Sequence, residues 1–171
     1  MEKILERYAF LEENPQLLRV GRLSEQDIST KFILPMLEAL NWDPLKITID
    51  GPEVHEKGFR ERGDVSQGLP DFSLRGKYSK KVPFFVEVKH PARPLSLKDL
   101  QTYEDGHLVF LTSFKESCLV VVGSHNKKYK YKKFTAISPK LYIKEFDNLW
   151  KHISNTKKAD GTRRAIKAGV H

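Results

Sequence analysis

Two apolar segments with charged residues at alternate positions constrain the fold of this chain more than any other feature. The first, "DFSL", spans residues 71–74, and the second, "FFVEV", spans residues 84–88 and is followed by Lys89. Side chains alternate between the two faces of a strand, so each segment has one apolar face and one face that carries charge. The polar run "GKYSKK" between them favours a turn. The sequence therefore predicts an antiparallel hairpin.

The apolar residues also predict the register of this hairpin. A turn centred near Ser79 pairs Phe72 with Val86 and Leu74 with Phe84. A shift of the register by one residue would move the whole apolar set to the opposite face, so that register is strongly disfavoured.

The same register places Asp71 opposite Glu87, with Lys89 on the face of Glu87. Opposed Cβ atoms lie about 4.5–5.5 Å apart, and two carboxylates about 4 Å apart repel by roughly 4 kcal/mol at an effective dielectric constant near 20. A proton or a cation relieves this repulsion, and oxygen ligands favour a hard ion such as Mg²⁺. The ion could bind a phosphate oxygen and acidify a water, and Lys89 could stabilise the charge that develops on phosphorus. The spacing fits phosphodiester hydrolysis, although a solvated surface cluster explains the same pattern.

A further acidic residue lies at the start of a well-marked helix. Ser24 can serve as the N-cap, Asp27 completes a capping box, Pro35 predicts a kink, and Asn41 is a suitable terminator after a helix that runs to about residue 40. Glu25 falls on the apolar stripe of this helix, which directs it toward the core or a cleft. A glutamate in the first turn also favours the helix dipole, which explains it without a site.

The remaining pattern predicts an α/β domain with a central mixed β-sheet flanked by helices. We expect a first helix from about residue 2 that Pro15 interrupts, and a short helix with Ser96 as its N-cap. Residues 1–155 form the predicted domain, and the basic residues 156–171 a flexible tail or linker. The other expected elements are strands at 46–51, 107–114 and 117–124, an edge strand at 126–134, and a helix at 138–154.

Composition narrows the classes of function. Thirty Lys and Arg against 22 Asp and Glu give a net charge of +8, which favours a polyanionic partner such as nucleic acid. The single cysteine, Cys118, excludes an internal disulfide framework and a cysteine-rich zinc module. The N-terminal residues do not fit a signal peptide, and no segment approaches the roughly 20 apolar residues that cross a bilayer. We expect a soluble cytoplasmic protein with no membrane partner.

Four segments, in this order, resemble the PD-(D/E)XK nuclease superfamily. They are "SEQDISTKFILPMLEALNWD", "GLPDFSL", "FFVEVKHP" and "LKDLQTYEDG", and the resemblance covers about residues 24 to 110. The likeness is greatest to the N-terminal nuclease domain of type I restriction-enzyme R subunits. It implies a restriction-endonuclease-like fold and an Mg²⁺-dependent DNA endonuclease, in which Mn²⁺ could substitute.

The resemblance also implies roles for individual residues. Asp71 and Glu87 would be metal ligands, with the carbonyl group of Val88 as a third. Lys89 would be the catalytic lysine. Glu25 matches a helical acid that contacts the metal or its waters in many members of the superfamily.

Gln101 matches the glutamine of a Q-x-x-x-Y element that lies near the site in the superfamily. The sequence departs from that element, because position 105 is Asp105 and the nearby tyrosine is Tyr103. The resemblance therefore implies a catalytic-site position for Gln101 and leaves Tyr103 without an assigned role.

The expected partners are DNA and the translocase, methyltransferase or specificity modules of a restriction system. Two alternatives remain open at this point. One is a non-catalytic nucleic-acid-binding or assembly module on the same fold, and the other is a stand-alone junction resolvase with the same chemistry. Arg60 and Arg62, and the "KKYKYKK" run, are further candidates for contacts to nucleic acid.

Overall fold

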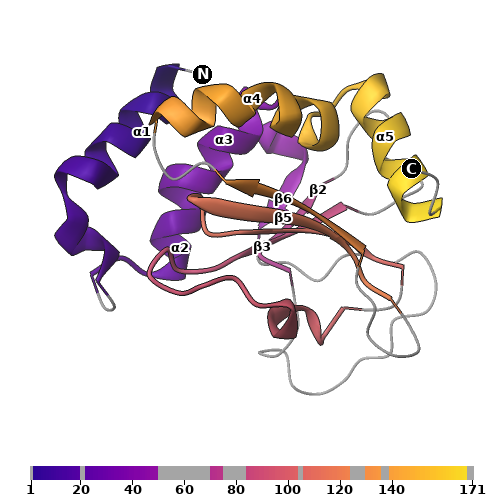
Figure 1. The fold of residues 1–171 in the computed structure, drawn as a ribbon, viewed down its shortest axis with the longest axis horizontal. Helices are drawn as coiled ribbons and strands as arrows, with labels where there is room; N and C mark the ends of the chain where they lie inside the picture. The colour runs from indigo at the N-terminus through magenta and orange to yellow at the C-terminus, as the bar shows by residue number, and fades with distance from the viewer. Residues whose placement is uncertain are drawn as a thin grey trace.

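One β-sheet with flanking helices makes up the described part of the chain (Figure 1). The computed structural model describes residues 2–19, 22–49, 70–74, 84–103, 106–123, 130–135 and 139–168. Arg60, Arg62 and the turn predicted near Ser79 lie outside these residues. Among the described helices, none combines the length and the hydropathy that crossing a bilayer requires. The predicted α/β class with a mixed sheet is confirmed.

Six described strands follow one another across the sheet in chain order. β3 and β4 are parallel, and the other neighbouring pairs are antiparallel. A parallel pair requires a crossover connection, which here contains the short 3₁₀ helix η4 (Leu97–Leu100). The strands are β1 (Ile47–Ile49), β2 (Phe72–Leu74), β3 (Phe84–Val88), β4 (Leu108–Thr112), β5 (Glu116–Val121) and β6 (Lys130–Thr135). The strand predicted at the edge corresponds to β6, which ends the sheet order.

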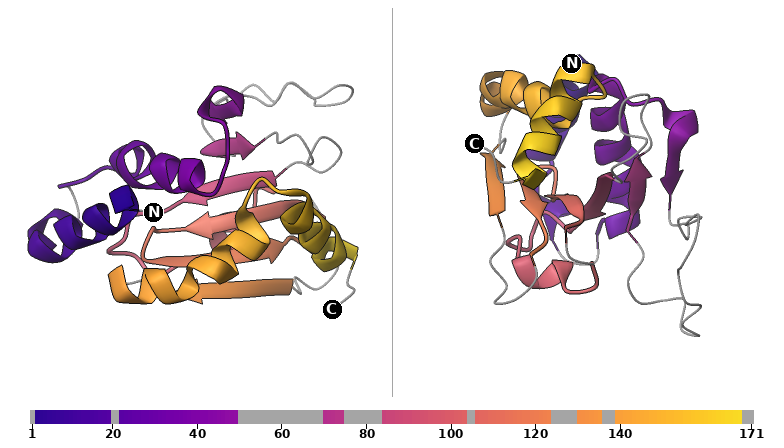
Figure 2. Two further views of the ribbon diagram at one scale, coloured as in Figure 1. Left: turned by 90° about the horizontal axis from the view of Figure 1, so that it is seen from above. Right: turned by 90° about the vertical axis from the view of Figure 1, so that its right-hand side faces the viewer.

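The longer helices pack against the sheet mainly on one face. Viewed from above, α4 crosses over the strands and α5 lies beyond its end (Figure 2). The helices and helical turns are α1 (Glu2–Glu13), η1 (Pro15–Leu18), α2 (Glu25–Ile28), the π-helical turn η2 (Ser29–Ile33), α3 (Leu34–Ala39), η3 (Pro44–Lys46), α4 (Pro139–Ile153) and α5 (Lys157–Ala168).

The register of β2 and β3 is the one that the apolar pattern predicts. Phe72 pairs with Val86, and Leu74 pairs with Phe84. All four side chains are buried, which confirms that the apolar face of the hairpin packs into the core. Because side chains alternate along a strand, this register directs Glu87 to the other face of the sheet.

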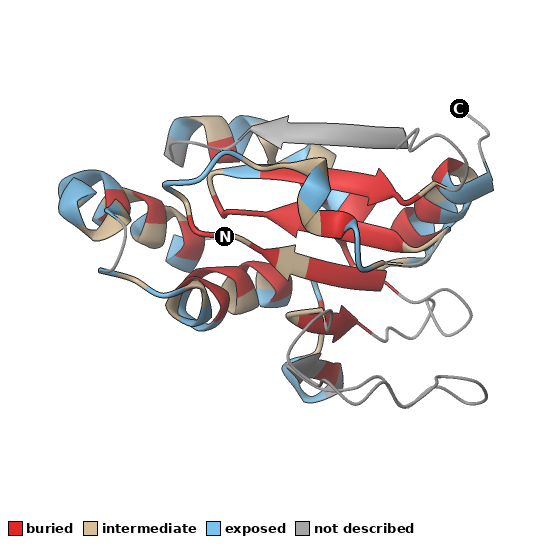
Figure 3. Cartoon of the chain, turned by 90° about the horizontal axis from the view of Figure 1, so that it is seen from below, coloured by how far each residue is buried: buried red, intermediate tan, exposed pale blue. Residues whose placement is uncertain are grey.

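The two faces of the sheet carry cores of different size. The larger core joins the apolar face of β3 to α1, α3 and α4, which lie above the sheet in Figure 1. The smaller core lies on the opposite face, where Phe85 packs with Leu100 and Tyr103 beside η4. The described parts of β2 to β5 are mostly buried between them (Figure 3). Glu87 therefore shares the face of the smaller core.

The helix that carries Glu25 begins and ends as the sequence predicts. The Ser24 hydroxyl accepts a hydrogen bond from the N–H of Asp27, and the Asp27 carboxylate accepts one from the N–H of Ser24, which completes the capping box. Asn41 follows the end of α3 with a φ of 69°, a left-handed conformation that asparagine tolerates. The helix is continuous from α2 through η2 to α3.

The π-helical turn Ser29–Ile33 lies just before Pro35, the position at which the sequence predicts a kink. Proline has no N–H to donate to the carbonyl group of Lys31, four residues earlier. Nε of Arg7, on α1, donates to that carbonyl group instead, and the N–H of Leu34 reaches back five residues to the carbonyl group of Ser29. The helix therefore accommodates Pro35 next to a wider, π-helical turn, and Arg7 of α1 is hydrogen-bonded to this turn.

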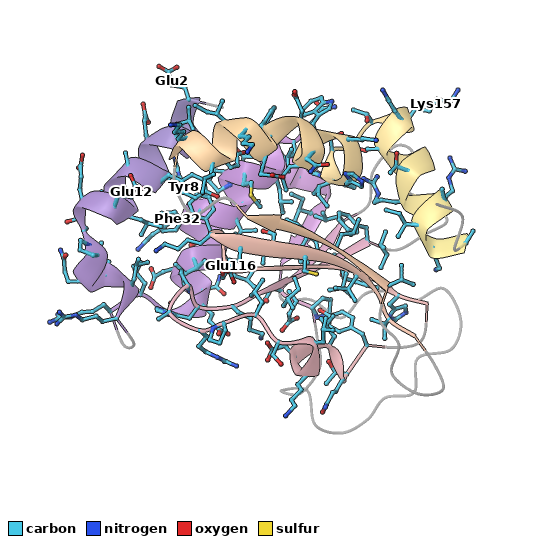
Figure 4. All side chains as sticks on the ribbon, viewed as in Figure 1. Glu2, Tyr8, Glu12, Phe32, Glu116 and Lys157 are labelled. Atoms are coloured by element: carbon cyan, nitrogen blue, oxygen red, sulfur yellow. The ribbon has the colours of Figure 1, made fainter. Side chains whose placement is uncertain are left out.

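Aromatic side chains fill the space between the N-terminal helices and the sheet. The Tyr8 hydroxyl donates a hydrogen bond of 2.6 Å to the carbonyl group of Phe114, and the two rings stack with centroids 4.1 Å apart. The ring of Phe32 lies 5.2 Å from that of Phe114. Tyr8 and Phe32 both lie on the inner side of their helices, whereas the Lys157 side chain projects outward from α5 (Figure 4).

The prediction of a flexible tail or linker at residues 156–171 is wrong for most of this segment, because residues 157–168 form the helix α5. Ala159, Arg163 and Ile166 lie on its buried side, at helical spacing. The helix exposes its lysines, which give the segment its basic composition and obscured the apolar stripe.

Arg163 anchors α5 to the rest of the fold. Its side chain is 2% exposed, and its Nη1 donates hydrogen bonds of 2.8 and 2.9 Å to the carbonyl groups of His152 and Ser154. The guanidinium also lies over the rings of Trp42 and Phe84, 5.6 and 5.1 Å from their centroids. A charge buried in this way requires such partners, so α5 is an integral part of the fold.

Candidate active site

The candidate site lies at the C-terminal end of β3, on the face of the smaller core. Glu87 belongs to this strand and Lys89 follows its end, while Asp71 immediately precedes β2 and Glu25 is the first residue of α2. Three segments that are far apart in the sequence thus supply the predicted side chains. The hairpin register and the capped helix place them.

Asp71 is anchored where the ladder between β2 and β3 ends. Continuing the observed register places Pro70 opposite Val88, and proline has no N–H with which to extend the pairing. The N–H of Val88 donates instead to Oδ2 of Asp71, at 2.5 Å. The Pro-Asp pair therefore has a physical role: the proline ends the strand pairing, and the carboxylate takes over the hydrogen bond.

Glu87 binds two different donors with its two oxygens. Oε1 lies 2.6 Å from Nζ of Lys89, and Oε2 accepts a hydrogen bond of 2.6 Å from the hydroxyl of Tyr103. The Glu87 and Lys89 side chains are only 13% and 15% exposed. At this low exposure, the pair is screened less by solvent than a surface ion pair.

Lys89 is held as an ammonium ion. Burial lowers its pKa, but the hydrogen bond and the charge of Glu87, followed by the charges of Glu25 and Asp71, raise it further, so the net pKa lies above the usual value. The main-chain N–H of Lys89 donates to the carbonyl group of Thr112 at 2.8 Å, which continues the pairing with β4 beyond the strand end. Both the charge and the position of Lys89 are therefore fixed by its surroundings.

Tyr103 is the site residue to which the sequence assigned no role. Its N–H donates to the carbonyl group of Leu100 at the end of η4, and its ring lies 5.8 Å from that of Phe85. Burial, the charge and hydrogen bond of Glu87, and the charge of Asp71 all raise the pKa of Tyr103 well above its usual value. The phenol therefore stays protonated and donates to Glu87. The turn of residues 101–103 brings this ring to the site.

Glu25 joins the cluster at its solvent-exposed rim. Its Oε2 lies 3.9 Å from Nζ of Lys89, and its Oε1 lies 3.8 Å from Nη1 of Arg93. The main-chain N–H of His90 also donates to Oε1, at 3.2 Å. The His90 ring is buried, and its Nδ1 accepts a hydrogen bond from the N–H of Ala92. The main-chain N–H of His90 thus helps to hold Glu25, while its ring bonds within the turn that follows Lys89.

The side chains of two predicted site residues, Gln101 and Val88, do not join the cluster. The Gln101 side chain is exposed, and no hydrogen bond or ion pair joins it to the cluster within the described part of the chain. The structure therefore does not bring Gln101 into the site. The Val88 side chain is buried in the larger core, so only its backbone adjoins the acidic groups.

The chemistry of the donors fits a hard divalent ion. Asp71, Glu87 and Glu25 contribute three formal negative charges against the single positive charge of Lys89, a net formal charge of −2, and Arg93 at the rim lies between Glu25 and a fourth carboxylate, Asp99. Within the described residues, no three His, Cys, Asp or Glu side chains come together as a metal-binding group. Mg²⁺ needs fewer, since it is commonly bound by one or two carboxylates with waters and substrate phosphates. Asp71 and Glu87 would supply two such carboxylates.

Comparison of the chain with models of protein families, with curated proteins and with solved structures finds no match.

Proposed function

We propose that this chain is an Mg²⁺-dependent DNA endonuclease of the PD-(D/E)XK type, with a restriction-endonuclease-like fold, and that it serves as the nuclease domain of a restriction system. One observation carries the proposal. Asp71, Glu87 and Lys89 converge on a single patch at the end of β3, where Nζ of Lys89 lies 2.6 Å from Glu87 and the carboxylate of Asp71 accepts the next N–H of the strand.

In this proposal the carboxylates of Asp71 and Glu87, with the carbonyl group of Val88, would hold the ion, and Glu25 would lie close enough to contact its waters. When bound, the ion would polarise a phosphoryl oxygen and lower the pKa of a coordinated water. Tyr103 fixes the orientation of the Glu87 carboxylate by donating to Oε2. The backbone N–H of Val88 does the same for Asp71.

Lys89 acts through its charge. Because its pKa is raised, the ammonium keeps its proton near neutral pH and does not serve as a general base. Its role is to donate to a nonbridging oxygen of the phosphodiester and to stabilise the negative charge that develops in the transition state. Such a preorganised donor is more effective in a partly buried site than in water.

The net charge of +8 supports DNA as the polyanionic partner. Contacts with backbone phosphates then dominate binding, which makes the affinity strongly dependent on salt. A cytoplasmic location and association with translocase, methyltransferase or specificity modules belong to the same proposal.

Single-turnover cleavage of duplex DNA tests this function. We expect cleavage in Mg²⁺ and none in EDTA. Lys89→Ala and Asp71→Asn should each slow cleavage by about 10²–10³-fold, the usual effect of removing one preorganised electrostatic group. Lys144→Ala is the control, because Lys144 is an exposed residue of α4, which packs on the face of the sheet opposite the site, and this variant should cleave at the wild-type rate. Equal rates in all variants and in EDTA would contradict the proposal.

One observation favours a second candidate, a non-catalytic nucleic-acid-binding module. Both carboxylate oxygens of Glu87 already have partners, in Lys89 and Tyr103, so Glu87 is satisfied by groups of the protein itself. Calorimetric titration with Mn²⁺ separates the two candidates. Heat of binding that Asp71→Asn abolishes supports the nuclease, whereas DNA binding without any metal binding supports the module.

A further inference from the structure

Arg93 occupies a distinctive position at the rim of the site. It closes a tight turn directly after Lys89, in which its N–H donates to the carbonyl group of His90 at 2.9 Å. Its side chain is 55% exposed, and its guanidinium lies between two carboxylates, 3.8 Å from Glu25 and 3.4 Å from Asp99. Both distances exceed those of a strong charge-assisted hydrogen bond. The guanidinium is thus positioned at the site but held loosely.

Neither carboxylate depends on Arg93 for its position. Asp99 is fixed by the capping box of η4, in which its Oδ2 accepts from the N–H of Ser96. Glu25 is held by the N–H of His90 and lies near Lys89. The pair of Arg93 with Glu25 is exposed and contributes little to stability, and the 3.4 Å contact of Arg93 with the less exposed Asp99 is longer than a strong charge-assisted hydrogen bond. Exchanging the carboxylates for another anion therefore costs Arg93 little.

The charge of the site explains why such a residue is useful. Asp71, Glu87 and Glu25 repel an incoming phosphodiester more than Lys89 alone attracts it. A guanidinium matches two phosphate oxygens with a pair of parallel N–H donors, a geometry that lysine cannot provide. Arg93 is the described arginine that pairs with a carboxylate of the site and still exposes half of its side chain.

We propose that Arg93 binds a phosphate of the nucleic-acid backbone next to the reacting phosphodiester, releasing Glu25 and Asp99 as it does so. This inference rests on the proposed function, since it places the substrate backbone across the same site. Arg93 is a substrate-binding residue in this arrangement, and it takes no part in proton transfer.

The salt dependence of DNA binding, measured in EDTA so that no cleavage occurs, tests this inference. The logarithm of the binding constant of a duplex is plotted against the logarithm of salt concentration for each variant. Loss of one phosphate contact in Arg93→Ala should reduce the slope by about 0.9. Arg93→Lys should keep the slope and bind more weakly than wild type, because the charge remains and the paired donors are lost.

Asp99→Asn and Lys144→Ala are the controls. Asp99→Asn removes one carboxylate that competes for Arg93, so binding should be as tight as in wild type or tighter. If Arg93 only tethers its loop to η4, Asp99→Asn would weaken binding as Arg93→Ala does, and this result would overturn the inference. Lys144→Ala should bind with the wild-type slope.

An unchanged slope in Arg93→Ala would also overturn the inference, as would failure of the wild-type chain to bind DNA at low salt. The outcome is distinguishable from failure of the proposed function. A chain that never cleaves DNA in Mg²⁺ but loses slope in Arg93→Ala would sustain the phosphate contact and refute the nuclease.

Discussion

The Glu87 side chain accepts hydrogen bonds from one charged and one neutral donor, and the two donors affect the carboxylate in different ways. The ammonium of Lys89 balances its charge, whereas the phenol of Tyr103 only orients it. The pKa of Tyr103 is raised because burial opposes ionisation and because loss of the proton would place a second negative charge beside Glu87. The neutral phenol is therefore part of the folded state.

Tyr103→Phe tests this contact through its dependence on pH. Near pH 8 we expect the variant to lose about 1–2 kcal/mol of unfolding free energy, since Glu87 loses a donor in a partly buried site. Burial and Glu87 raise the pKa of the folded phenol above its usual value of about 10. Above pH 10 the unfolded phenol ionises first and the folded state binds more protons, so this stabilisation falls as the pH rises.

The wild-type and Phe curves of unfolding free energy should therefore converge above pH 10, by up to about 1.4 kcal/mol per pH unit. Urea unfolding at pH 8, 9, 10 and 11 measures both curves. A difference between them that stays constant over this range would show that the Tyr103 proton is not coupled to folding.

The residues at which β2, β3 and the Glu25 helix begin or end determine where the side chains of the site lie. Strand β2 begins just after Pro70, the N–H of Val88 is left to the Asp71 carboxylate, and β3 continues its pairing with β4 as far as Lys89. The helix with Glu25 starts at a capping box. The π-helical turn Ser29–Ile33 follows it, and α1 is joined to this turn through Arg7, whose Nε donates to the carbonyl group of Lys31.

A double-mutant cycle tests the link between Arg7 and Pro35. Arg7→Ala should destabilise the wild type by about 1 kcal/mol, because the carbonyl group of Lys31 loses its charged donor. In a Pro35→Ala background the new backbone N–H can supply that carbonyl group, so Arg7→Ala should cost less. We expect a coupling energy of about 0.5–1 kcal/mol from urea unfolding of the four proteins. Additive effects would contradict the link.

Local patterns in the sequence predicted most of these elements. The alternation of apolar and charged residues predicted the register of β2 with β3, and the Ser24–Asp27 spacing predicted the start of the site helix. These features are readable because nearby residues determine them. The hairpin register alone placed Asp71, Glu87 and Lys89 together, whereas the position of Glu25 beside them was implied by the resemblance to the superfamily.

The features that the sequence did not reveal depend on tertiary packing. Tyr103 reaches Glu87 because η4 docks its leucines against Phe85, and the same turn leaves Gln101 exposed. Motif spacing alone cannot distinguish these two outcomes. Likewise, the acceptors of Arg163 are backbone carbonyl groups at the end of α4, which leave no signature in the side-chain pattern.

The C-terminal helix α5 links parts of the fold that are distant in the sequence. α5 packs against the end of α4 and reaches the ring of Trp42 near the N-terminal helices through Arg163. Burial lowers the pKa of Arg163 to about 10, partly offset by the charge of Asp160. This unfavourable burial is compensated by the two carbonyl acceptors and the two rings, so the contact joins segments that are distant in the sequence.

Arg163→Ala should lower the unfolding free energy by about 3 kcal/mol or more, because it removes the charged donor of two buried carbonyl groups and opens a cavity. Arg163→Met retains much of the volume and should lose less. Lys158→Ala, on the exposed side of α5, should lie within about 0.5 kcal/mol of wild type. Urea unfolding checks all three. Wild-type stability of Arg163→Ala would restore the view that this segment is a dispensable tail.

The central claim is that Asp71 and Glu87 together hold a divalent ion, and diffraction from crystals grown with Mn²⁺ tests it most directly. The predicted result is an anomalous peak about 2.1 Å from a carboxylate oxygen of each residue, which disappears in Asp71→Asn. A well-ordered site with no anomalous peak between these two carboxylates, at millimolar Mn²⁺, would contradict the claim.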